Sequence, residues 1–246
     1  MTGKLTEKQL EEALAVLDDV LMDLPETISR DSIRSFLAAR LAEAKCWWTG
    51  SPMQGFAAAD EERSHLLVLA VGRPWQHQGI GRSLLKDICR DLEQEGIARL
   101  TLNALESIVP FYRAAGFLET GEAVEASGLR VIPMEKLLLE DLLGITVTVE
   151  VEHGAGSYHE LYPDLVYPVN TGSVCINGQI HEAYIIGPKE PLDRFTGMVS
   201  ALIYRRSSDA VRLAVSQTPL TKEKIVSEAG ALEQYDDTVI RLYKGN

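Results

Sequence analysis

The chain has 246 residues, 46% of them hydrophobic, which is enough for two domains with buried cores. A formal net charge of −12 argues against a nucleic-acid partner, because phosphate backbones are bound by clustered Lys and Arg. Three cysteines without C-x-x-C spacing indicate reduced thiols, and no apolar run has the length of a signal peptide or a membrane span, so we expect a cytoplasmic protein.

Two helices are predicted first, within residues 5–44. Thr6 and Gln9 have the spacing of a capping box and precede leucines at helical spacing, and this helix should stop near Pro25. Ser29 can cap a second helix, whose apolar face would consist of Ile33, Phe36, Leu37 and Leu41. Both helices are interpreted as packing elements.

Strands come next, and one of them leads into a glycine-containing loop. Residues 46–49 and 53–59 predict a hairpin, and residues 65–71 are an apolar run typical of a strand covered on both faces. Residues 76–82 then read Q-H-Q-G-I-G-R and open a helix that ends before Gly96. Glycines let a backbone approach a phosphate, and a helix N-terminus attracts its charge. A tight turn is the alternative for the loop taken alone.

The remaining elements divide into two groups. The first module continues with a strand over residues 98–104 that ends near Asn103, a short helix over 107–115 and a returning strand over 129–137, and it closes near residue 138. From residue 145 the sequence is mostly β-like, with one terminal helix that begins after Thr221 and carries Leu232. We expect a small barrel with one helix for this second half.

The order strand, Q-x-x-G-x-G loop, helix, strand and F-Y-R-A-A-G-F (residues 111–117) resembles the GNAT acyltransferase family. The resemblance covers about residues 46–138. It implies a mixed sheet with flanking helices and acetyl coenzyme A (acetyl-CoA) as donor, held between two splayed parallel strands. The residues that would bind this cofactor are Leu69, Ala70, Val71, Gln76, His77, Gln78, Gly79, Ile80, Gly81, Arg82 and Asn103.

The resemblance also implies roles for these residues. Backbone groups of residues 78–82 would bind the pyrophosphate, with Gln76 shaping the loop and the cations of Arg82 and Arg73 adding attraction. A backbone N–H from residues 69–71 would stabilise charge on the acetyl oxygen. Tyr112 would be the general acid for the departing thiolate, or else a packing residue. Asn103 would bind the pantetheine arm or the acceptor, or else act as a strand-end turn residue.

A base for the attacking amine is less clearly indicated. Glu61, Glu62 and His65 are the nearest candidates, although acidic residues before a strand usually form a solvated turn and a water chain could replace them. The module also departs from the family pattern. No first strand is evident in residues 1–4, Pro74 is displaced relative to the loop, and we expect a shortened acceptor-binding segment.

The second module resembles soluble inorganic pyrophosphatases. The resemblance rests on Y-P-V-N-T-G-S (167–173) and N-G-Q-I-H-E-A-Y (177–184), spans about residues 145–243 and implies a five-stranded OB-like barrel. The family's D-G-D-x-x-D loop reads here as Asn177, Gly178, Gln179 and Glu182, which leaves one carboxylate where several Mg²⁺ ions need more. Asp209 and Arg212 align uncertainly with another acidic stretch.

A remodelled cleft in this barrel could still bind a ligand. His153, His159 and His181 would offer polar groups there, but they lack the spacing of metal ligands, so no metal site is predicted. An inactive barrel is therefore favoured over an active phosphatase.

The predicted fold class is a GNAT-like α/β domain, residues 1–138, followed by a mostly-β barrel with a C-terminal helix, residues 145–246. Our first functional hypothesis is an N-acetyltransferase acting on a primary amine of a small molecule or peptide, with the barrel as a regulatory, scaffolding or homodimerisation domain. The second is a non-catalytic acyl-CoA sensor, and the weakest is a Mg-dependent pyrophosphatase. No membrane or nucleic-acid partner is expected.

Overall fold

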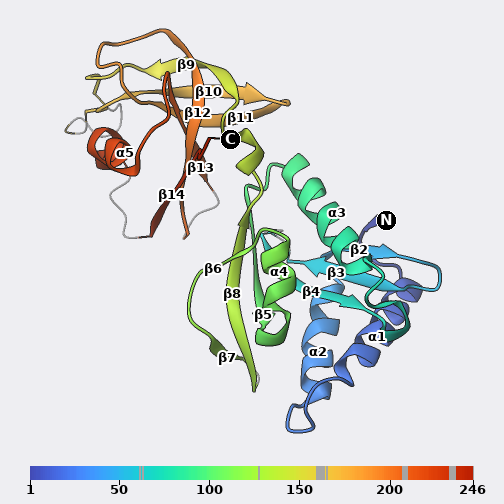
Figure 1. Cartoon of the computed structure of the whole chain (residues 1–246). Helices are drawn as coiled ribbons and strands as arrows, with labels where there is room; N and C mark the ends of the chain where they lie inside the picture. Colours follow the sequence, from blue (N-terminus) through green and yellow to red (C-terminus); the bar gives the residue numbers. More distant parts are fainter. Residues whose placement is uncertain are drawn as a thin grey trace. The chain divides into compact units, whose positions relative to one another are not determined.

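The computed structural model describes residues 1–60, 62, 64–126, 128–158, 164, 166–206, 210–232 and 237–245. The chain divides into two compact units, Met1–Leu138 and Leu139–Asn246, each of which is described by itself (Figure 1). Within the described ranges, no helix has the length and apolar character that crossing a membrane requires.

Unit 1 is built on one mixed sheet with the strand order β1-β2-β3-β4-β5-β8-β6, and β7 also pairs with β8. Its strands are β1 (Thr2–Gly3), β2 (Lys45–Thr49), β3 (Gly55–Ala59), β4 (His65–Val71), β5 (Arg99–Leu105), β6 (Leu118–Glu119), β7 (Val124–Ala126) and β8 (Leu129–Leu137). Its helices are α1 (Glu7–Leu21), α2 (Arg30–Leu41), α3 (Ile80–Gln94) and α4 (Val109–Ala114). The predicted α/β class is confirmed.

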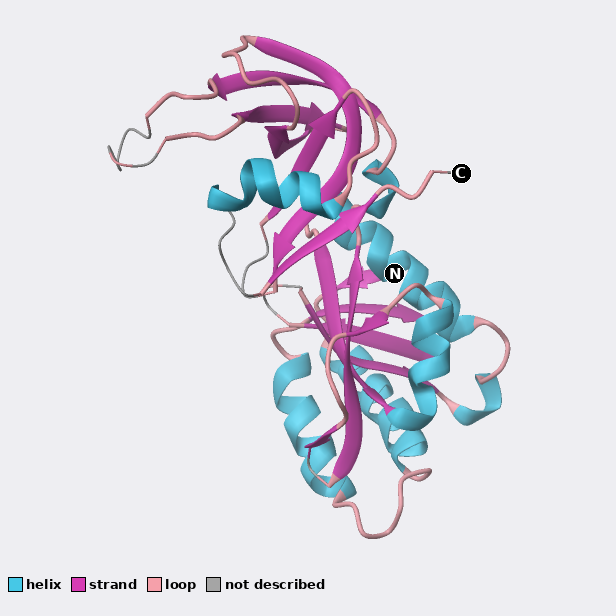
Figure 2. Ribbon diagram, turned by 60° about the vertical axis from the view of Figure 1, so that its left-hand side comes forward, coloured by secondary structure: helices cyan, strands magenta, loops and turns pink. Residues whose placement is uncertain are grey.

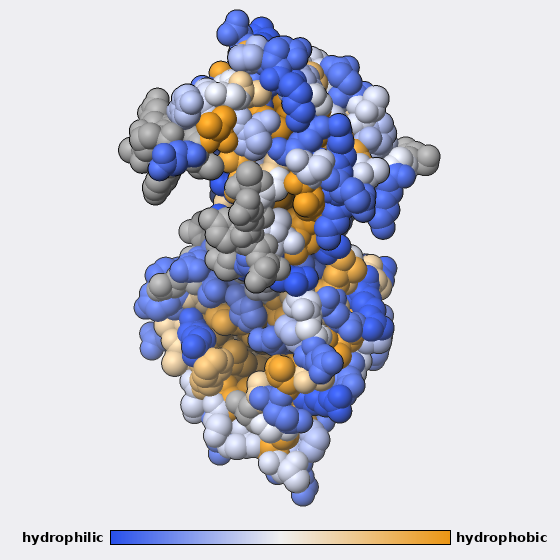
Figure 3. All heavy atoms as spheres, turned by 90° about the vertical axis from the view of Figure 1, so that its left-hand side faces the viewer, coloured by the Kyte–Doolittle hydropathy of each residue, from blue (hydrophilic) through white to orange (hydrophobic). Residues whose placement is uncertain are grey.

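The helices cover both faces of the sheet (Figure 2). Phe56 and Ala58 of β3 pack with α1 and α2, whereas Ala57 and Ala59 belong to the core that α3 and α4 complete. This alternation follows from the two-residue period of a strand, and an all-apolar strand is what a sheet covered on both faces requires. Exposed large apolar side chains of unit 1 include Met22, Phe36, Ile108, Leu118 and Val124. On the face of unit 1 in Figure 3, orange apolar side chains gather within a rim of hydrophilic ones.

The helix starts agree with the predicted caps. Thr6 and Gln9 form both bonds of the capping box, and Ser29 accepts a hydrogen bond from the backbone of Ser32 at 3.3 Å. Two details differ. Helix α1 ends at Leu21, before Pro25, and Phe36 is 53% exposed because its ring lies beneath the Arg40 guanidinium rather than in the core.

A first strand is present, contrary to the expectation from residues 1–4. Thr2 pairs with Trp47 and Gly3 with Cys46, so β1 extends the sheet at the edge of β2. A two-residue strand held by backbone bonds has no side-chain alternation by which the sequence could reveal it.

Unit 2 is a closed five-stranded barrel. The strands are β9 (Thr146–His153), β10 (Asn170–Ile176), β11 (Gln179–Ile185), β12 (Arg194–Arg205) and β13 (Val211–Ser216). Closure occurs because β12 pairs with both β9 and β13, while β13 also pairs in parallel with β11. The predicted barrel with one C-terminal helix, α5 (Lys222–Ala229), is confirmed.

Two features at the end of unit 2 were not predicted correctly. Helix α5 is capped by Thr221 as expected but ends at Ala229, so Leu232 lies beyond it in a short 3-10 turn. A further strand, β14 (Thr238–Leu242), pairs with β12 outside the closed barrel. Its five residues are all half-buried, so they lack the alternating pattern by which a strand is recognised.

Candidate functional site

Strands β4 and β5 run in parallel but part almost immediately. Their pairs are His65 with Thr101 and Leu66 with Leu102; beyond these, β4 stays with β3 and β5 with β8. Figure 1 shows the two strands diverging. At about 3.3 Å per residue, roughly 16 Å of the β4 edge has no strand beside it. The backbone groups on this edge are available to an extended ligand.

Residues 69–71 lie on this open edge. Leu69 packs toward the α3 core, Ala70 is buried on the side of α1 and α2, and Val71 is half-buried. Because the side chains point to the two faces of the sheet, the groups that face the opening are N–H and C=O groups of the backbone. This is where the predicted N–H donor for an acetyl oxygen is placed.

The glycine loop follows at the C-terminal end of β4. Gln76 donates from its side-chain amide to the Val71 carbonyl at 3.0 Å, and Gln78 donates to the Pro74 carbonyl at 2.9 Å. Gln76 therefore ties the loop back to β4, as its expected shaping role requires. His77 and Gly79 both have positive φ, +60° and +83°, which turns the chain into α3.

The N-terminus of α3 is open to an anion. Gly79 stands at the N-cap and offers no side chain, and no acidic residue lies in the first turn. Ser83 donates its N–H to the Gly79 carbonyl at 3.0 Å, but the N–H groups of residues 78–82 donate to no acceptor within the described chain. A Cβ at Gly79 would meet nothing within 4 Å. Unpaired donors, the positive helix end and open space together fit a phosphate group.

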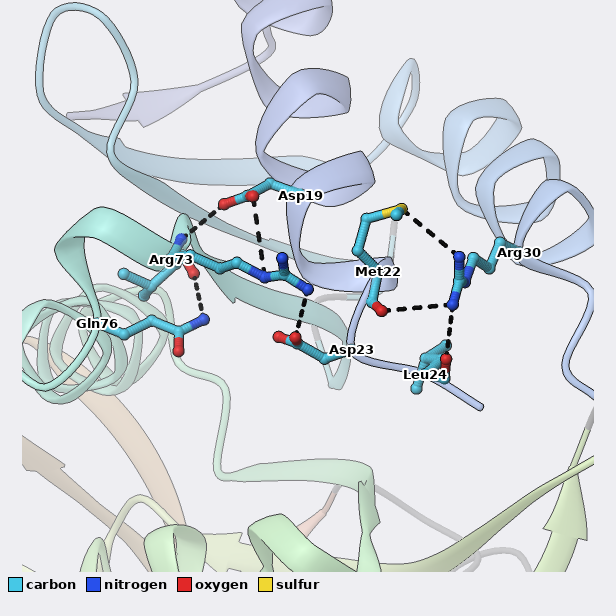
Figure 4. A network of polar contacts seen from close by, with 8 residues as sticks. Asp19, Met22, Asp23, Leu24, Arg30, Arg73 and Gln76 are labelled. Carbon is cyan, nitrogen blue, oxygen red and sulfur yellow. Dashed lines mark hydrogen bonds and ion pairs between the residues drawn. The ribbon is translucent and has the colours of Figure 1, made fainter. Parts of the chain in front are cut away.

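The cations near the loop differ in their surroundings. Arg82 is exposed and forms no ion pair with the described residues, so its charge is available. Arg73 is bound by two carboxylates, Asp19 of α1 and Asp23 just beyond the end of α1. Its guanidinium pairs with Asp23 and lies 4.0 Å from Asp19, whose second oxygen accepts the Arg73 backbone N–H at 2.6 Å (Figure 4). Asp19 and Asp23 were not singled out from the sequence, where their i, i+4 spacing was the available signal.

Tyr112 lies in α4, with 8% of its surface exposed. Its ring packs edge-on against Phe111 and Phe117, at centroid distances of 5.0 and 5.5 Å. Burial raises the pKa of Tyr112 to about 12, so the hydroxyl is protonated at neutral pH. Within the described chain this hydroxyl forms no hydrogen bond. It therefore remains free to donate to a ligand, and its ring also contributes to the core.

Helix α4 is held by a contact at its C-terminal end. Lys136 of β8 donates to the Ala115 carbonyl at 2.7 Å, and Phe117 donates its backbone N–H to the Tyr112 carbonyl at 3.0 Å. A cation at a helix C-terminus satisfies unpaired carbonyls and complements the helix dipole. Lys136, which the sequence analysis missed, thus fixes the helix that carries Tyr112.

Asn103 lies within β5 rather than at its end. It pairs with Pro133 of β8, its side chain is exposed, and the strand continues to Leu105. The sequence placed the strand end too early because Asn resembles a turn residue, whereas here its backbone belongs to the ladder. Asn103 lies just beyond the last β4–β5 pair, beside the opening.

Neither of the two described candidate bases, Glu62 and His65, lies next to residues 69–71. Glu61 is outside the described residues, and Glu62 is exposed in the turn before β4, where it lines a cavity of about 480 Å³ with Asp60. His65 precedes Leu69 by roughly 13 Å of strand. Its Nδ1 lies 2.9 Å from the Thr101 hydroxyl, and burial lowers its pKa, with Asp60 opposing this shift.

In unit 2, the residues that the sequence analysis aligned with an acidic loop lie around the β10–β11 turn. Asn177 and Gly178 have positive φ, and Glu182 on β11 pairs with Arg212 at 2.8 Å. Burial lowers the pKa of His181, and His153 stacks on Tyr167 at 4.5 Å. His159 and Asp209 are outside the described residues. In the part of the chain that is described, no group of three or more His, Cys, Asp or Glu side chains could hold a metal ion.

Comparison with known families identifies unit 1. The model of the family described as "Acetyltransferase (GNAT) domain" matches residues 14–138, more than half of the chain. The chain therefore belongs to the GNAT acetyltransferase family, as the loop and the 111–117 motif indicated. Among curated proteins, none matches the chain.

Several solved structures are similar to this chain. A GCN5-related N-acetyltransferase from Rhodopseudomonas palustris has 17% identity and a TM-score of 0.48, with 56% of this chain and 94% of that chain covered. The ribosomal-protein-S18-alanine N-acetyltransferase from Escherichia coli has 21% identity and a TM-score of 0.44, covering 56% and 93%. An aminoglycoside 6'-N-acetyltransferase complexed with coenzyme A has 16% identity and a TM-score of 0.45, covering 56% and 97%.

Proposed function

We propose that this chain is an N-acetyltransferase that uses acetyl-CoA as donor and a primary amine of a small molecule or peptide as acceptor. The observation that carries the proposal is the presence of three parts in one module. These are the open β4 edge, the uncapped N-terminus of α3 at the end of that strand, and the buried, protonated Tyr112 on α4. Membership of the GNAT family supports the same reaction class.

The residues around the opening fit the donor. The N–H groups of residues 78–82 would hold the pyrophosphate, with Arg82 as the adjacent cation and Gln76 maintaining the loop. Asn103 and the backbone of residues 69–71 would line the remainder along the opening. Bound acetyl-CoA supplies an activated acetyl thioester. The chain contributes orientation and preformed hydrogen-bond donors, which are large terms in acyl-transfer catalysis.

Tyr112 would donate a hydrogen bond or proton toward the sulfur. Its pKa of about 12 lies well above that of a free thiol, about 8.5, so complete proton transfer to the thiolate is uphill. Its contribution is therefore stabilisation of developing charge from a largely buried position, with a modest effect on rate.

For unit 2 we propose a pyrophosphatase-like barrel that no longer hydrolyses pyrophosphate and acts as a regulatory, scaffolding or dimerisation domain. Two observations support this. Asn177 and Gln179 stand where metal-binding carboxylates are needed, and Glu182 is paired with Arg212 at 2.8 Å. A carboxylate that neutralises an arginine is a poor ligand for a hard divalent cation.

The test has two stages. Calorimetric titration with coenzyme A measures binding, and a screen of primary amines with acetyl-CoA then measures thiol release by the wild type and Tyr112→Phe. We expect one coenzyme A per chain and thiol release that depends on an amine and on Tyr112. Binding without turnover on any amine would instead favour the acyl-CoA sensor.

A further inference from the structure

The segment that leads into the phosphate-binding loop is attached to two neighbouring elements by polar bonds. Gly72 donates its N–H to the Gln54 carbonyl of the β2–β3 turn at 2.9 Å. Arg73 donates its N–H to Asp19 of α1, and its guanidinium binds Asp23, which follows the end of that helix. In Figure 4, Asp19 on α1 and Asp23 beyond its end both point toward Arg73, and Gln76 lies on the other side.

A surface hollow lies between α1 and the loop entry. The hollow is about 230 Å³ in volume and is lined by Glu12, Ala15, Val16, Asp19, Pro52, Met53, Gly72, Pro74 and Trp75. Hydrogen bonds and ion pairs cross beside this hollow, from the loop entry to α1 and to the turn that follows it.

The charges in this cluster determine what Arg73 can do. Two carboxylates surround one guanidinium, so Arg73 is compensated before any phosphate arrives. Exposed ion pairs contribute little individually, and these side chains are about half exposed. The bond from the Arg73 backbone to Asp19 is charge-assisted, however, and fixes the main chain itself.

The end of α1 is also held from a second side. Arg30 of α2 donates to the Leu24 carbonyl at 2.8 Å and to the Met22 carbonyl at 3.3 Å. Asp23 lies between these two residues and binds Arg73. Residues 22–24 therefore have contacts on two sides. Asp23 binds Arg73 of the loop entry, and the carbonyls of Met22 and Leu24 bind Arg30 of α2.

We propose that Arg73 is a positioning residue, which together with Asp19 and Asp23 forms a latch that holds the phosphate-binding loop, residues 76–82, against α1. The latch acts on the loop through the backbone and makes no contact with phosphate. This inference rests on the proposed function, because its consequence is measured as coenzyme A affinity. A displacement of a binding element by about 1 Å weakens the contacts that this element makes with its ligand. A residue that does not touch the ligand can therefore change its affinity.

The experiment is a double-mutant cycle on coenzyme A binding, measured by calorimetry. Arg73→Gln and Asp23→Asn each remove the guanidinium–Asp23 pair, and Asp19→Ala removes the carboxylate that accepts the Arg73 backbone N–H. Asp18→Asn is the matched control, because Asp18 pairs with Arg34 of α2 at 2.7 Å and does not touch the loop. We expect Asp19→Ala to weaken binding about three- to tenfold, Arg73→Gln and Asp23→Asn to weaken it by a smaller and equal factor, their double variant to be no weaker than either, and the control to be unchanged.

Two results would overturn the latch. If Arg73 bound phosphate directly, Asp23→Asn would free the cation and leave affinity unchanged or improved, while Arg73→Gln alone would weaken binding. If the cluster were an ordinary surface pair, no variant would differ from the wild type. Failure of the wild type to bind coenzyme A would instead contradict the proposed function.

Amide hydrogen exchange without ligand provides a second readout. We expect the latch variants to exchange faster than the wild type over residues 72–76, where the N–H groups of Gly72, Arg73, Trp75 and Gln76 are hydrogen-bonded, with unchanged exchange in α3 beyond residue 84. Faster exchange throughout unit 1 would indicate general unfolding and would contradict a local positioning role.

Discussion

The Nδ1 atom of His65 lies 2.9 Å from the Thr101 hydroxyl oxygen, across one of the two pairs that join β4 to β5. The Ser64 carbonyl, which accepts the Thr101 backbone N–H at 2.8 Å, also lies 2.9 Å from the Thr101 hydroxyl oxygen. The hydroxyl either gives its single proton to this carbonyl and accepts from Nδ1–H, or gives it to an unprotonated Nδ1.

This relationship predicts how stability depends on pH. Burial lowers the pKa of His65 below its usual 6.5, so the unfolded chain binds more protons than the native one in the window below pH 6.5. The contribution of His65 is fully present above pH 6.5 and is lost as the pH falls through the lowered pKa. Urea unfolding measured between pH 5 and 8 should show that the free energy of unfolding falls less toward low pH for His65→Asn than for the wild type. An equal fall in the two proteins would contradict this prediction.

Tyr112→Phe should reduce kcat by about 10- to 100-fold while the affinity for coenzyme A stays unchanged. The reason is that the ring still packs between Phe111 and Phe117 and only the proton donor is lost. Since the pKa of Tyr112 is about 12, this residue should cause no decrease in kcat up to about pH 10. Steady-state kinetics against pH tests both statements. An unchanged kcat would assign Tyr112 to packing alone.

Gly79 and Gly81 should respond differently to alanine. Gly79 has φ +83°, so Gly79→Ala is strained by about 1 kcal/mol and also places a methyl group in the open space before α3. A Cβ at Gly81 would make ordinary contacts, the nearest at 3.5 Å from Leu69, so Gly81→Ala should fold with little loss. Thermal unfolding measures the loss of stability of each variant, and calorimetric titration measures its affinity for coenzyme A.

Gly79→Asn separates strain from bulk. Asn tolerates left-handed backbone, so this variant should recover much of the stability lost in Gly79→Ala. Its longer side chain still occupies the open space and should weaken coenzyme A binding further. Binding equal to the wild type would contradict the placement of a phosphate there.

Lys136→Met should lower kcat about tenfold through α4 rather than through the substrate. The variant loses the 2.7 Å bond to the Ala115 carbonyl, so the helix that carries Tyr112 is held less precisely. The test is kinetic non-additivity: once Tyr112→Phe is present, Lys136→Met should have little further effect on kcat. Full additivity would show that Lys136 acts independently of Tyr112.

Unit 2 should not respond to magnesium. With Glu182 bound to Arg212, we expect 10 mM Mg²⁺ to change the Tm by no more than about 1 °C and phosphate release from pyrophosphate to equal that of Glu182→Ala. Release well above that variant would contradict the proposal of an inactive barrel.

Much of unit 1 was predictable from local signals. The Thr6 and Ser29 caps, the apolar run of β4 and the turn at Gly96 each follow from chemistry within a few residues of sequence. The barrel was likewise indicated by short β-branched runs. The two-residue β1 was not, because its stability comes from backbone bonds to β2, a strand more than 40 residues away.

The candidate site shows the same division. The glycines of residues 76–82 make this loop recognisable in the sequence, whereas the contacts that hold the loop in place are not recognisable there. Asp23 and Arg73 are 50 residues apart, and nothing in either neighbourhood marks them as partners. The separation of β4 from β5 was expected only through the family resemblance, because it depends on the pairing of each strand with its other neighbour, which local sequence patterns do not reveal.

The central claim is that residues 78–82 bind the pyrophosphate of acetyl-CoA, and amide hydrogen exchange with and without saturating acetyl-CoA tests it most directly. The N–H groups of these residues have no acceptor in the described chain, so their exchange should slow markedly when the ligand is bound. Unchanged exchange at residues 78–82, with the ligand bound and protection found elsewhere, would contradict the account.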